Sequence, residues 1–231
     1  MSARYAVYFA PAQGSPWWEF GTRWLGRDEC LDLQISQTAL PQIEPAELHA
    51  ATAEPRRYGF HATLKAPFAL RSGRTVDDLI TRMQDLAATL MPVALGPMQA
   101  AKLGDFLALV PVRVPDALLG LASACVTLLD DLRAPFSAAD LLRRRVEHLD
   151  AREQSLLAQY GYPYVLERYR LHLTLSGPVA PPMAERILHA SAAPVAQLNA
   201  TAPLTLDRLC LFVEPAPGQP FKRIADAEMA T

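Results

Sequence analysis

The chain has 231 residues, of which 51% are hydrophobic and 20% are charged, the composition of a soluble globular protein that buries a sizeable core. Its formal net charge of −2 argues against a tight complex with long nucleic acid, because such complexes need an extended basic surface. The 3 cysteines are odd in number and scattered, so they form neither a metal-binding pattern nor a disulfide framework, and we expect a cytoplasmic location.

A first strand is predicted over residues 4–10, where apolar and other side chains alternate. Arg4 and Tyr8 fall on the same side of this strand, which makes them candidates for substrate contacts. The apolar stretch ends at Pro11 and is too short for a signal peptide, and no later segment is long enough to span a membrane. We therefore expect no membrane partner.

A helix is predicted to begin at Ser15, which is a suitable N-cap, with Pro16 at the first helical position. Three aromatic residues then follow at near-helical spacing. We predict that they belong to the core and do not form a platform for stacking bases. These residues are Trp17, Phe20 and Trp24. Residues 36–57 are predicted to be a loop or short helix.

The stretch from residue 58 to 67 reads Tyr-Gly-Phe-His-Ala-Thr-Leu-Lys-Ala-Pro and is predicted to be a strand that stops at its proline. Successive side chains of a strand point to opposite faces. His61, Thr63 and Lys65 are therefore expected to share one face, with the apolar residues between them on the other. Lys65 would add a positive charge to any anion site on that face.

The middle of the chain is predicted to contain one helix, a pair of strands and two further helices. Arg143 to Arg145 form a basic run in the last of these helices, and we interpret them as a solvated helix face. The predicted ranges are 76–90 for the first helix, 93–101 and 105–114 for the strands, and 115–132 and 137–159 for the last two helices.

The stretch from residue 169 to 178, Tyr-Arg-Leu-His-Leu-Thr-Leu-Ser-Gly-Pro, repeats the first motif without a gap. His172 and Thr174 share one face of the second predicted strand, and Arg170 lies on the same face as a candidate substrate contact. Tyr58 and Tyr169, three residues before each histidine, are expected to face away and to pack. A helix (182–192) and strands (200–205, 209–214 and 221–224) follow, so the repeat is broader than the motif and predicts two related lobes.

The two His-x-Thr motifs, His61-Ala-Thr63 and His172-Leu-Thr174, resemble the signature of the 2H phosphoesterase superfamily. Residues 4–11, 24–28, 57–68 and 161–164 resemble the branch of that superfamily that is encoded with phosphonate (C–P lyase) operons. The resemblance implies an α+β fold of two pseudo-symmetric lobes, each an antiparallel sheet with helices on its outer face, and a catalytic cleft between them. We expect one domain over 1–231, with lobes at about 1–114 and 161–231 joined by helices at 115–160.

The resemblance and the motifs together predict a metal-independent cyclic phosphodiesterase, a hydrolase that opens a small cyclic phosphodiester. His61 and His172 would act as general acid and general base, and the sequence leaves open which is which. Thr63 and Thr174 would donate hydrogen bonds to the phosphate oxygens, which gain charge in the transition state. We expect no metal or cofactor, a monomer, and a small phosphorylated substrate of the ribosyl 1,2-cyclic phosphate type.

Two alternatives stay open at the level of sequence. One keeps the chemistry but acts on RNA ends with 2′,3′-cyclic phosphates or on 2′–5′ linkages, and the near-neutral charge disfavours it. The other is a non-catalytic protein that binds a phosphorylated ligand, which would not need two titrating imidazoles. The segment Gly161-Tyr-Pro-Tyr164 is either a plain turn or the source of a tyrosine on the rim of the cleft.

Overall fold

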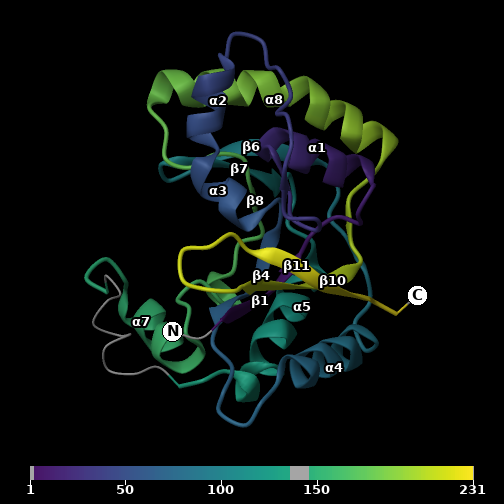
Figure 1. Cartoon of the computed structure of the whole chain (residues 1–231), viewed down its shortest axis with the longest axis vertical. Helices are drawn as coiled ribbons and strands as arrows, with labels where there is room; N and C mark the ends of the chain where they lie inside the picture. The colour runs from purple at the N-terminus through teal and green to yellow at the C-terminus, as the bar shows by residue number, and fades with distance from the viewer. Residues whose placement is uncertain (1–2, 136–145, 231) are drawn as a thin grey trace.

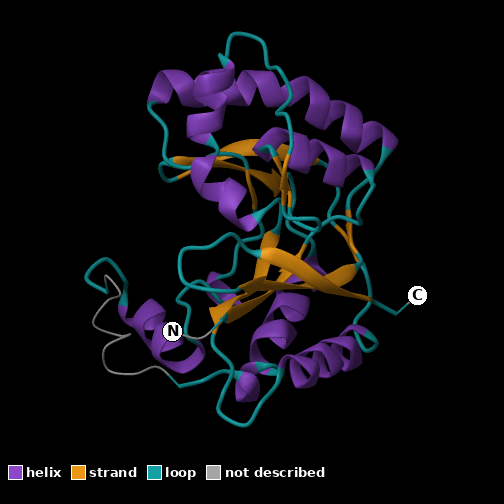
Figure 2. Ribbon diagram, in the orientation of Figure 1, coloured by secondary structure: helices purple, strands orange, loops and turns teal. Residues whose placement is uncertain are grey.

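The computed structural model describes residues 3–135 and 146–230 and shows an α+β protein with several antiparallel sheets, as the sequence predicts (Figures 1 and 2). The strands are β1 (Arg4–Phe9), β2 (Arg27–Asp28), β3 (Leu33–Gln34), β4 (Ala62–Phe68), β5 (Val93–Ala94), β6 (Met98–Leu103), β7 (Phe106–Pro111), β8 (Leu173–Thr174), β9 (Thr205–Leu206), β10 (Arg208–Glu214) and β11 (Lys222–Glu228).

Two sheets carry the motif strands. The larger has the order β11-β10-β1-β4 and contains the first motif in β4, and the smaller has the order β6-β7-β8 and contains the second motif in β8. All of these neighbours are antiparallel. Strands β10 and β11 lie beside β1, and β8 lies beside β7, so each sheet combines strands from both of the expected lobe ranges.

Helices cover the two sheets on their outer sides. In Figure 1, α8 and α1 lie over the smaller sheet in the upper part of the view, while α4 and α5 lie against the larger sheet in the lower part. Within the described ranges, none of the helices has both the length and the apolar character needed to cross a membrane. The helices are α1 (Pro16–Leu25), α2 (Pro45–Ala51), α3 (Ala53–Tyr58), α4 (Val76–Ala87), α5 (Asp116–Thr127), α7 (Ala151–Tyr160) and α8 (Pro181–Thr201).

Three predicted elements differ from the observed ones. The helix expected over 137–159 is shorter within the described part, because residues 146–150 are not helical and α7 begins at Ala151, and the predicted basic run at Arg143 to Arg145 lies outside the described residues. The second motif strand is short, because β8 pairs with β7 only at Leu173 and Thr174. The strand expected from residue 200 was wrong in its first part, because α8 continues to Thr201 with a proline inside it.

Helix α1 connects the two motif strands. Its N-cap is Ser15, whose side-chain oxygen accepts a hydrogen bond from the Trp18 amide at 3.3 Å, as the sequence predicts. Trp24 is buried, and its indole Nε1 donates to the carbonyl of Leu175, at the end of the second motif, at 2.8 Å. Gly21 faces Phe60, the residue before His61, so closely that helix and strand touch.

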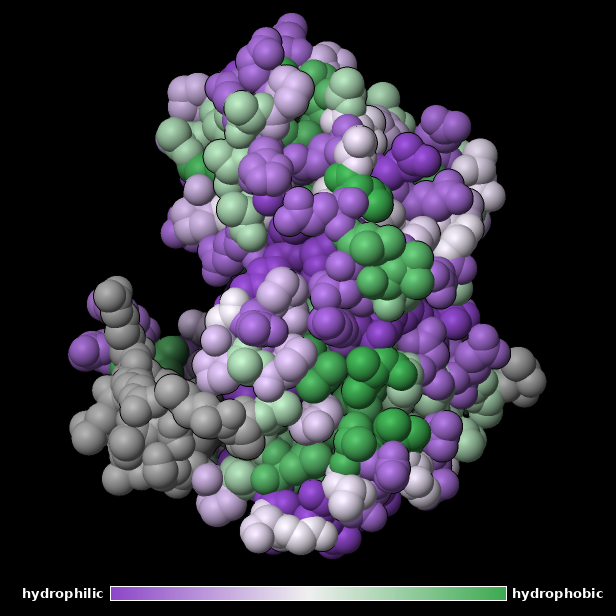
Figure 3. All heavy atoms as spheres, in the orientation of Figure 1, coloured by the Kyte–Doolittle hydropathy of each residue, from purple (hydrophilic) through white to green (hydrophobic). Residues whose placement is uncertain are grey.

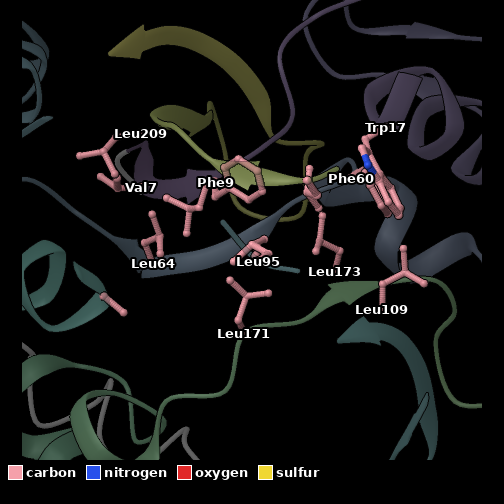
Figure 4. Packing of buried hydrophobic residues seen from close by; sticks show 14 of the residues in the cluster. Val7, Phe9, Trp17, Phe60, Leu64, Leu95, Leu109, Leu171, Leu173 and Leu209 are labelled. Carbon is pink, nitrogen blue, oxygen red and sulfur yellow. The ribbon is translucent and has the colours of Figure 1, made fainter. Parts of the chain in front are cut away.

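One hydrophobic core joins the apolar faces of both motif strands. Phe60 and Leu64 from the first motif pack in the same cluster as Leu171 and Leu173 from the second (Figure 4). All four side chains are buried, as the alternating pattern predicts. Burial of apolar surface stabilises the fold by about 25 cal/mol per Å². It keeps the apolar face of each motif in the core, so the face that carries the histidine and threonine is turned away from the core.

Because Phe60 lies so close to Gly21, we expect alanine to have opposite effects on stability at two helical glycines, Gly21 and Gly120. In Gly21→Ala the new Cβ would lie 2.0 Å from Phe60 Cγ, so we expect overpacking to lower the free energy of unfolding by about 1–3 kcal/mol. Gly120→Ala in α5 is the control, because nothing lies within 4 Å of its added Cβ, and we expect stabilisation of about 0.5–1 kcal/mol. Urea unfolding measures both, and equal effects would contradict the packing described.

Candidate functional site

A cavity of about 470 Å³ lies between the two sheets and receives side chains from both motifs. His61 and Thr63 line it from the first motif, and His172 and Thr174 line it from the second. Its volume is in the range of small-molecule sites. Figure 3 shows hydrophilic side chains gathered across the waist of the molecule, between the parts that hold the two sheets. The structure thus brings the two His-x-Thr motifs together at one cavity.

The two histidines are held in the same way. His61 Nδ1 lies 3.0 Å from the carbonyl oxygen of Gly59, and His172 Nδ1 lies 2.8 Å from the carbonyl oxygen of Arg170. A carbonyl oxygen only accepts hydrogen bonds, so each Nδ1 donates and each neutral ring keeps its lone pair at Nε2. The backbone two residues upstream therefore sets the same tautomer in both motifs.

Each imidazole also rests against an aromatic ring. Tyr8 stacks on His61 with ring centroids 3.8 Å apart, and Phe106 lies 5.8 Å from His172. The hydroxyl of Thr63 is 3.3 Å from His61 Nε2 and donates to it. A ligand oxygen that enters the cavity can replace His61 as the acceptor for this hydroxyl.

Burial and the nearby His172 lower the pKa of His61 to about 4, although the hydrogen bond to Gly59 opposes the shift. At neutral pH His61 is therefore an uncharged imidazole whose Nε2 lone pair accepts the Thr63 hydroxyl until a ligand oxygen replaces it as the acceptor. Such a group accepts a proton from a hydroxyl that is placed within hydrogen-bonding reach. The arrangement is chemically able to move a proton at a group bound between the two motifs.

Lys65 does not reach this cavity, which corrects the expectation that it shares a face with His61. The pairing of β4 with β1 shifts by one residue, since Tyr8 lies opposite Thr63 but Val7 lies opposite Lys65. This β-bulge turns the strand, so Lys65 lies on the core side with Val7. Its Nζ donates to the Asp130 carboxylate at 2.9 Å and to the Val126 carbonyl at 3.0 Å.

Arg4 and Tyr8 both line the cavity, on the side of β1 that the sequence predicts. Arg4 pairs with Glu214, a fully buried carboxylate that Arg57 also pairs with. Burial alone would raise the pKa of Glu214, but Arg4, the Gly218 amide and Arg57 lower it below its usual value. Two guanidinium groups thus share one carboxylate, and of the three groups only Arg4 lines the cavity.

Sequence reasoning missed Tyr58, which lines the cavity although it was expected to pack away from it. It is the last residue of α3 and precedes Gly59, whose φ of 79° breaks the strand alternation on which the expectation rested. Tyr162 also lines the cavity, so the segment 161–164 contributes a tyrosine to the rim. In the sequence, the glycine at position 59 was the one feature that could have indicated a break in the alternation and hence that Tyr58 faces the cavity.

Arg170 lies outside this first cavity and lines a second one of about 510 Å³. The two cavities share His172, Thr63, Ala66, Phe106 and Tyr162, so they are neighbours on either side of the second histidine. Within residues 3–135 and 146–230, no group of three or more His, Cys, Asp or Glu side chains is placed to hold a metal ion.

The fold and the paired motifs define an α+β protein in which both motifs line a cavity between two antiparallel sheets. Residues 63–222 match the model of a family described as protein of unknown function (DUF1045), and the chain belongs to this family. The matched range contains Thr63 and the whole of the second motif.

Two curated relatives are similar to the chain. One, from Janthinobacterium sp. (strain Marseille), is 40% identical over 221 residues, which are 94% of this chain and 49% of that protein. The other, from Laribacter hongkongensis (strain HLHK9), is 37% identical over 219 residues, which are 95% of this chain and 50% of that protein. Both are named "Ribose 1,5-bisphosphate phosphokinase PhnN", and the chain spans about half of their length.

These names correct the predicted activity. A phosphokinase transfers a phosphoryl group to an acceptor other than water, so the relatives are named as transferases, and the prediction of a cyclic phosphodiesterase, a hydrolase, is overturned. The PhnN name and the DUF1045 family do fit the phosphonate-associated branch to which the sequence pointed.

The lowered pKa of His61 predicts how stability depends on pH. The unfolded chain has a histidine pKa near 6.5 and the folded value is about 4, so the folded state binds fewer protons between these values. We expect His61 to contribute a loss of stability as the pH falls from about 6.5 toward 4. Urea unfolding across this range should show a smaller loss for His61→Asn than for wild type, with exposed His189→Asn as the control. Identical pH dependence in all three proteins would contradict a neutral, partly buried His61.

The position of Lys65 predicts a structural role. Lys65→Met leaves Asp130 without one of its two cationic partners, so we expect the free energy of unfolding to fall by about 2 kcal/mol. Lys102→Met, an exposed residue of β6, should change it by less than about 0.5 kcal/mol. Because Lys65 lies away from the cavity, neither variant should alter ligand affinity. A loss of affinity in Lys65→Met at unchanged stability would refute this placement.

Proposed function

We propose that this chain binds a phosphorylated sugar of the ribose bisphosphate type in the cavity between the two motifs. The observation that carries the proposal is that both His-x-Thr motifs and Arg4 line the same cavity. Hydroxyl groups, imidazoles and a guanidinium are the side chains that bind phosphate oxygens in proteins.

The cavity has groups suited to both parts of such a ligand. Thr63 and Thr174 donate to phosphate oxygens, and Arg4 adds charge. Two carboxylates, Glu54 and Asp105, line the same cavity. A carboxylate accepts hydrogen bonds and repels phosphate, so these two suit sugar hydroxyls. Phosphate and hydroxyl groups on one small ligand match this lining better than phosphate alone.

We assign His61 and His172 to proton transfer at the bound phosphoryl group. His61 supports this role because it is neutral, and its Nε2 lone pair becomes available when a phosphate oxygen accepts the Thr63 hydroxyl in its place. His172 supports it because its ring is held by the same kind of carbonyl contact. The phosphokinase name belongs to proteins about twice as long, so the proposal for this chain is confined to recognition and proton transfer at its own cavity.

The proposal includes membership of the 2H phosphoesterase superfamily at the level of fold. Two antiparallel sheets with helices outside and one His-x-Thr motif in each support a pair of pseudo-symmetric lobes. The lobes are not consecutive halves of the chain in this proposal, because β10 and β11 complete the sheet that holds β4.

Calorimetric titration with ribose 1,5-bisphosphate tests the proposed ligand. We expect Thr63→Val and Thr174→Val each to weaken binding about tenfold, because each removes a hydrogen bond to a charged group worth about 1.5–3 kcal/mol. Thr127→Val, on an exposed position of α5, should bind as wild type does. Unphosphorylated ribose should bind more weakly than the bisphosphate. Absence of bisphosphate binding by the folded wild type, or equal affinity in all three threonine variants, would overturn the proposal.

A further inference from the structure

The second cavity continues from the first past His172, and its lining differs in charge. Five residues border both cavities and so mark the passage between them: Thr63, Ala66, Phe106, Tyr162 and His172. With about 470 Å³ on one side and about 510 Å³ on the other, the pair is longer than one phosphate group needs. A ligand held at the motifs can therefore extend into the second cavity.

Among the residues that line the second cavity, Arg170 is the arginine that is available to bind an anion. Its guanidinium forms no hydrogen bond or ion pair with any residue that the structure describes, and it lines the second cavity, whereas Arg4 lines the first. Arg168, the other arginine of this lining, already pairs with Asp150. Arg170 is exposed, so no partner within the described chain has to be displaced before it binds an anion.

The two carboxylates of the second cavity are both engaged elsewhere. Glu153 accepts a hydrogen bond from the Asp150 amide at the start of α7, at 3.0 Å. Glu167 pairs with Arg152, which lowers its pKa. Arg152 thus offsets the charge of Glu167, the Asp150 amide holds the Glu153 carboxylate at the start of α7, and neither carboxylate pairs with Arg170. This contrasts with the first cavity, where Arg4 shares Glu214 with Arg57.

We infer that the second cavity is a subsite for a second phosphate group, bound by Arg170, on the same ligand whose first phosphate lies between the two His-x-Thr motifs. The inference rests on the proposed function and adds to it a reason why a bisphosphate is preferred to a monophosphate. Phe106 and Tyr162, at the passage, provide flat apolar walls for the carbon skeleton that joins the two phosphates.

The test compares ligands with one and two phosphates in matched variants. Calorimetry with ribose 1,5-bisphosphate, ribose 5-phosphate and ribose 1-phosphate is run on wild type, Arg170→Gln, Arg170→Lys and Arg113→Gln. Arg113 is exposed, lies in neither cavity, and serves as the control for loss of one positive charge. The wild type should bind the bisphosphate more tightly than either monophosphate.

We expect Arg170→Gln to weaken bisphosphate binding about tenfold, as expected for a lost charge-assisted contact, and Arg170→Lys to weaken it less. The tighter-binding monophosphate, seated at the motifs, should keep its affinity in every variant. Raising the salt concentration should narrow the difference between wild type and Arg170→Gln, since exposed charges are screened.

The possible failures are distinguishable. If wild type binds the bisphosphate and the threonine variants weaken it, but Arg170→Gln leaves the affinity unchanged, the subsite is refuted and the proposed function stands. Equal losses in Arg170→Gln and Arg113→Gln would also refute it, because they would reflect net charge alone. If folded wild type binds none of the three sugars, both the subsite and the proposed function fall.

Discussion

The site depends on the burial, in one shared core, of the apolar residues that alternate with the histidine and threonine of each motif. Phe60 and Leu64 are held there from the first motif, and Leu171 and Leu173 from the second. Successive residues of an extended segment point to opposite sides, so burying one set of alternate residues also fixes the direction of the other set. The two histidines line a common cavity because exposing their apolar neighbours, which are buried in the core, would cost free energy.

Much of this arrangement was predictable from sequence, because alternation is a local property. The pattern identified which residues of each motif face the cavity, and the repeat indicated that the two faces meet. It failed where the backbone departs from a regular strand. The bulge in β4 moves Lys65 to the core side, and the positive φ of Gly59 carries Tyr58 into the cavity. Neither event has a signature in hydrophobic periodicity, since a bulge is decided by pairing with a distant strand.

The sequence predicted which residues line the cavity better than it predicted the type of reaction, because the same side chains serve several reactions of phosphate groups. Imidazole, hydroxyl and guanidinium groups around a phosphate serve binding, hydrolysis and transfer alike, and the outcome depends on what else reaches the phosphorus. The relatives that correct the predicted hydrolase are about twice as long as this chain. His61 and Thr174 line one cavity here, but about half the length of those relatives lies outside the range that matches this chain.

The order of strands in the larger sheet has a consequence for biosynthesis. Strand β1 lies between β4 and β10, and the ion pair of Arg4 with Glu214 joins residues that are 210 positions apart in the sequence. A ribosome releases the N-terminal strand long before the strand that completes its pairing. The edge of β1 that pairs with β10 therefore stays unpaired until β10 has been synthesised. Contacts between residues so distant in sequence also slow folding. We expect the nascent chain to be open to chaperones until the last strands emerge.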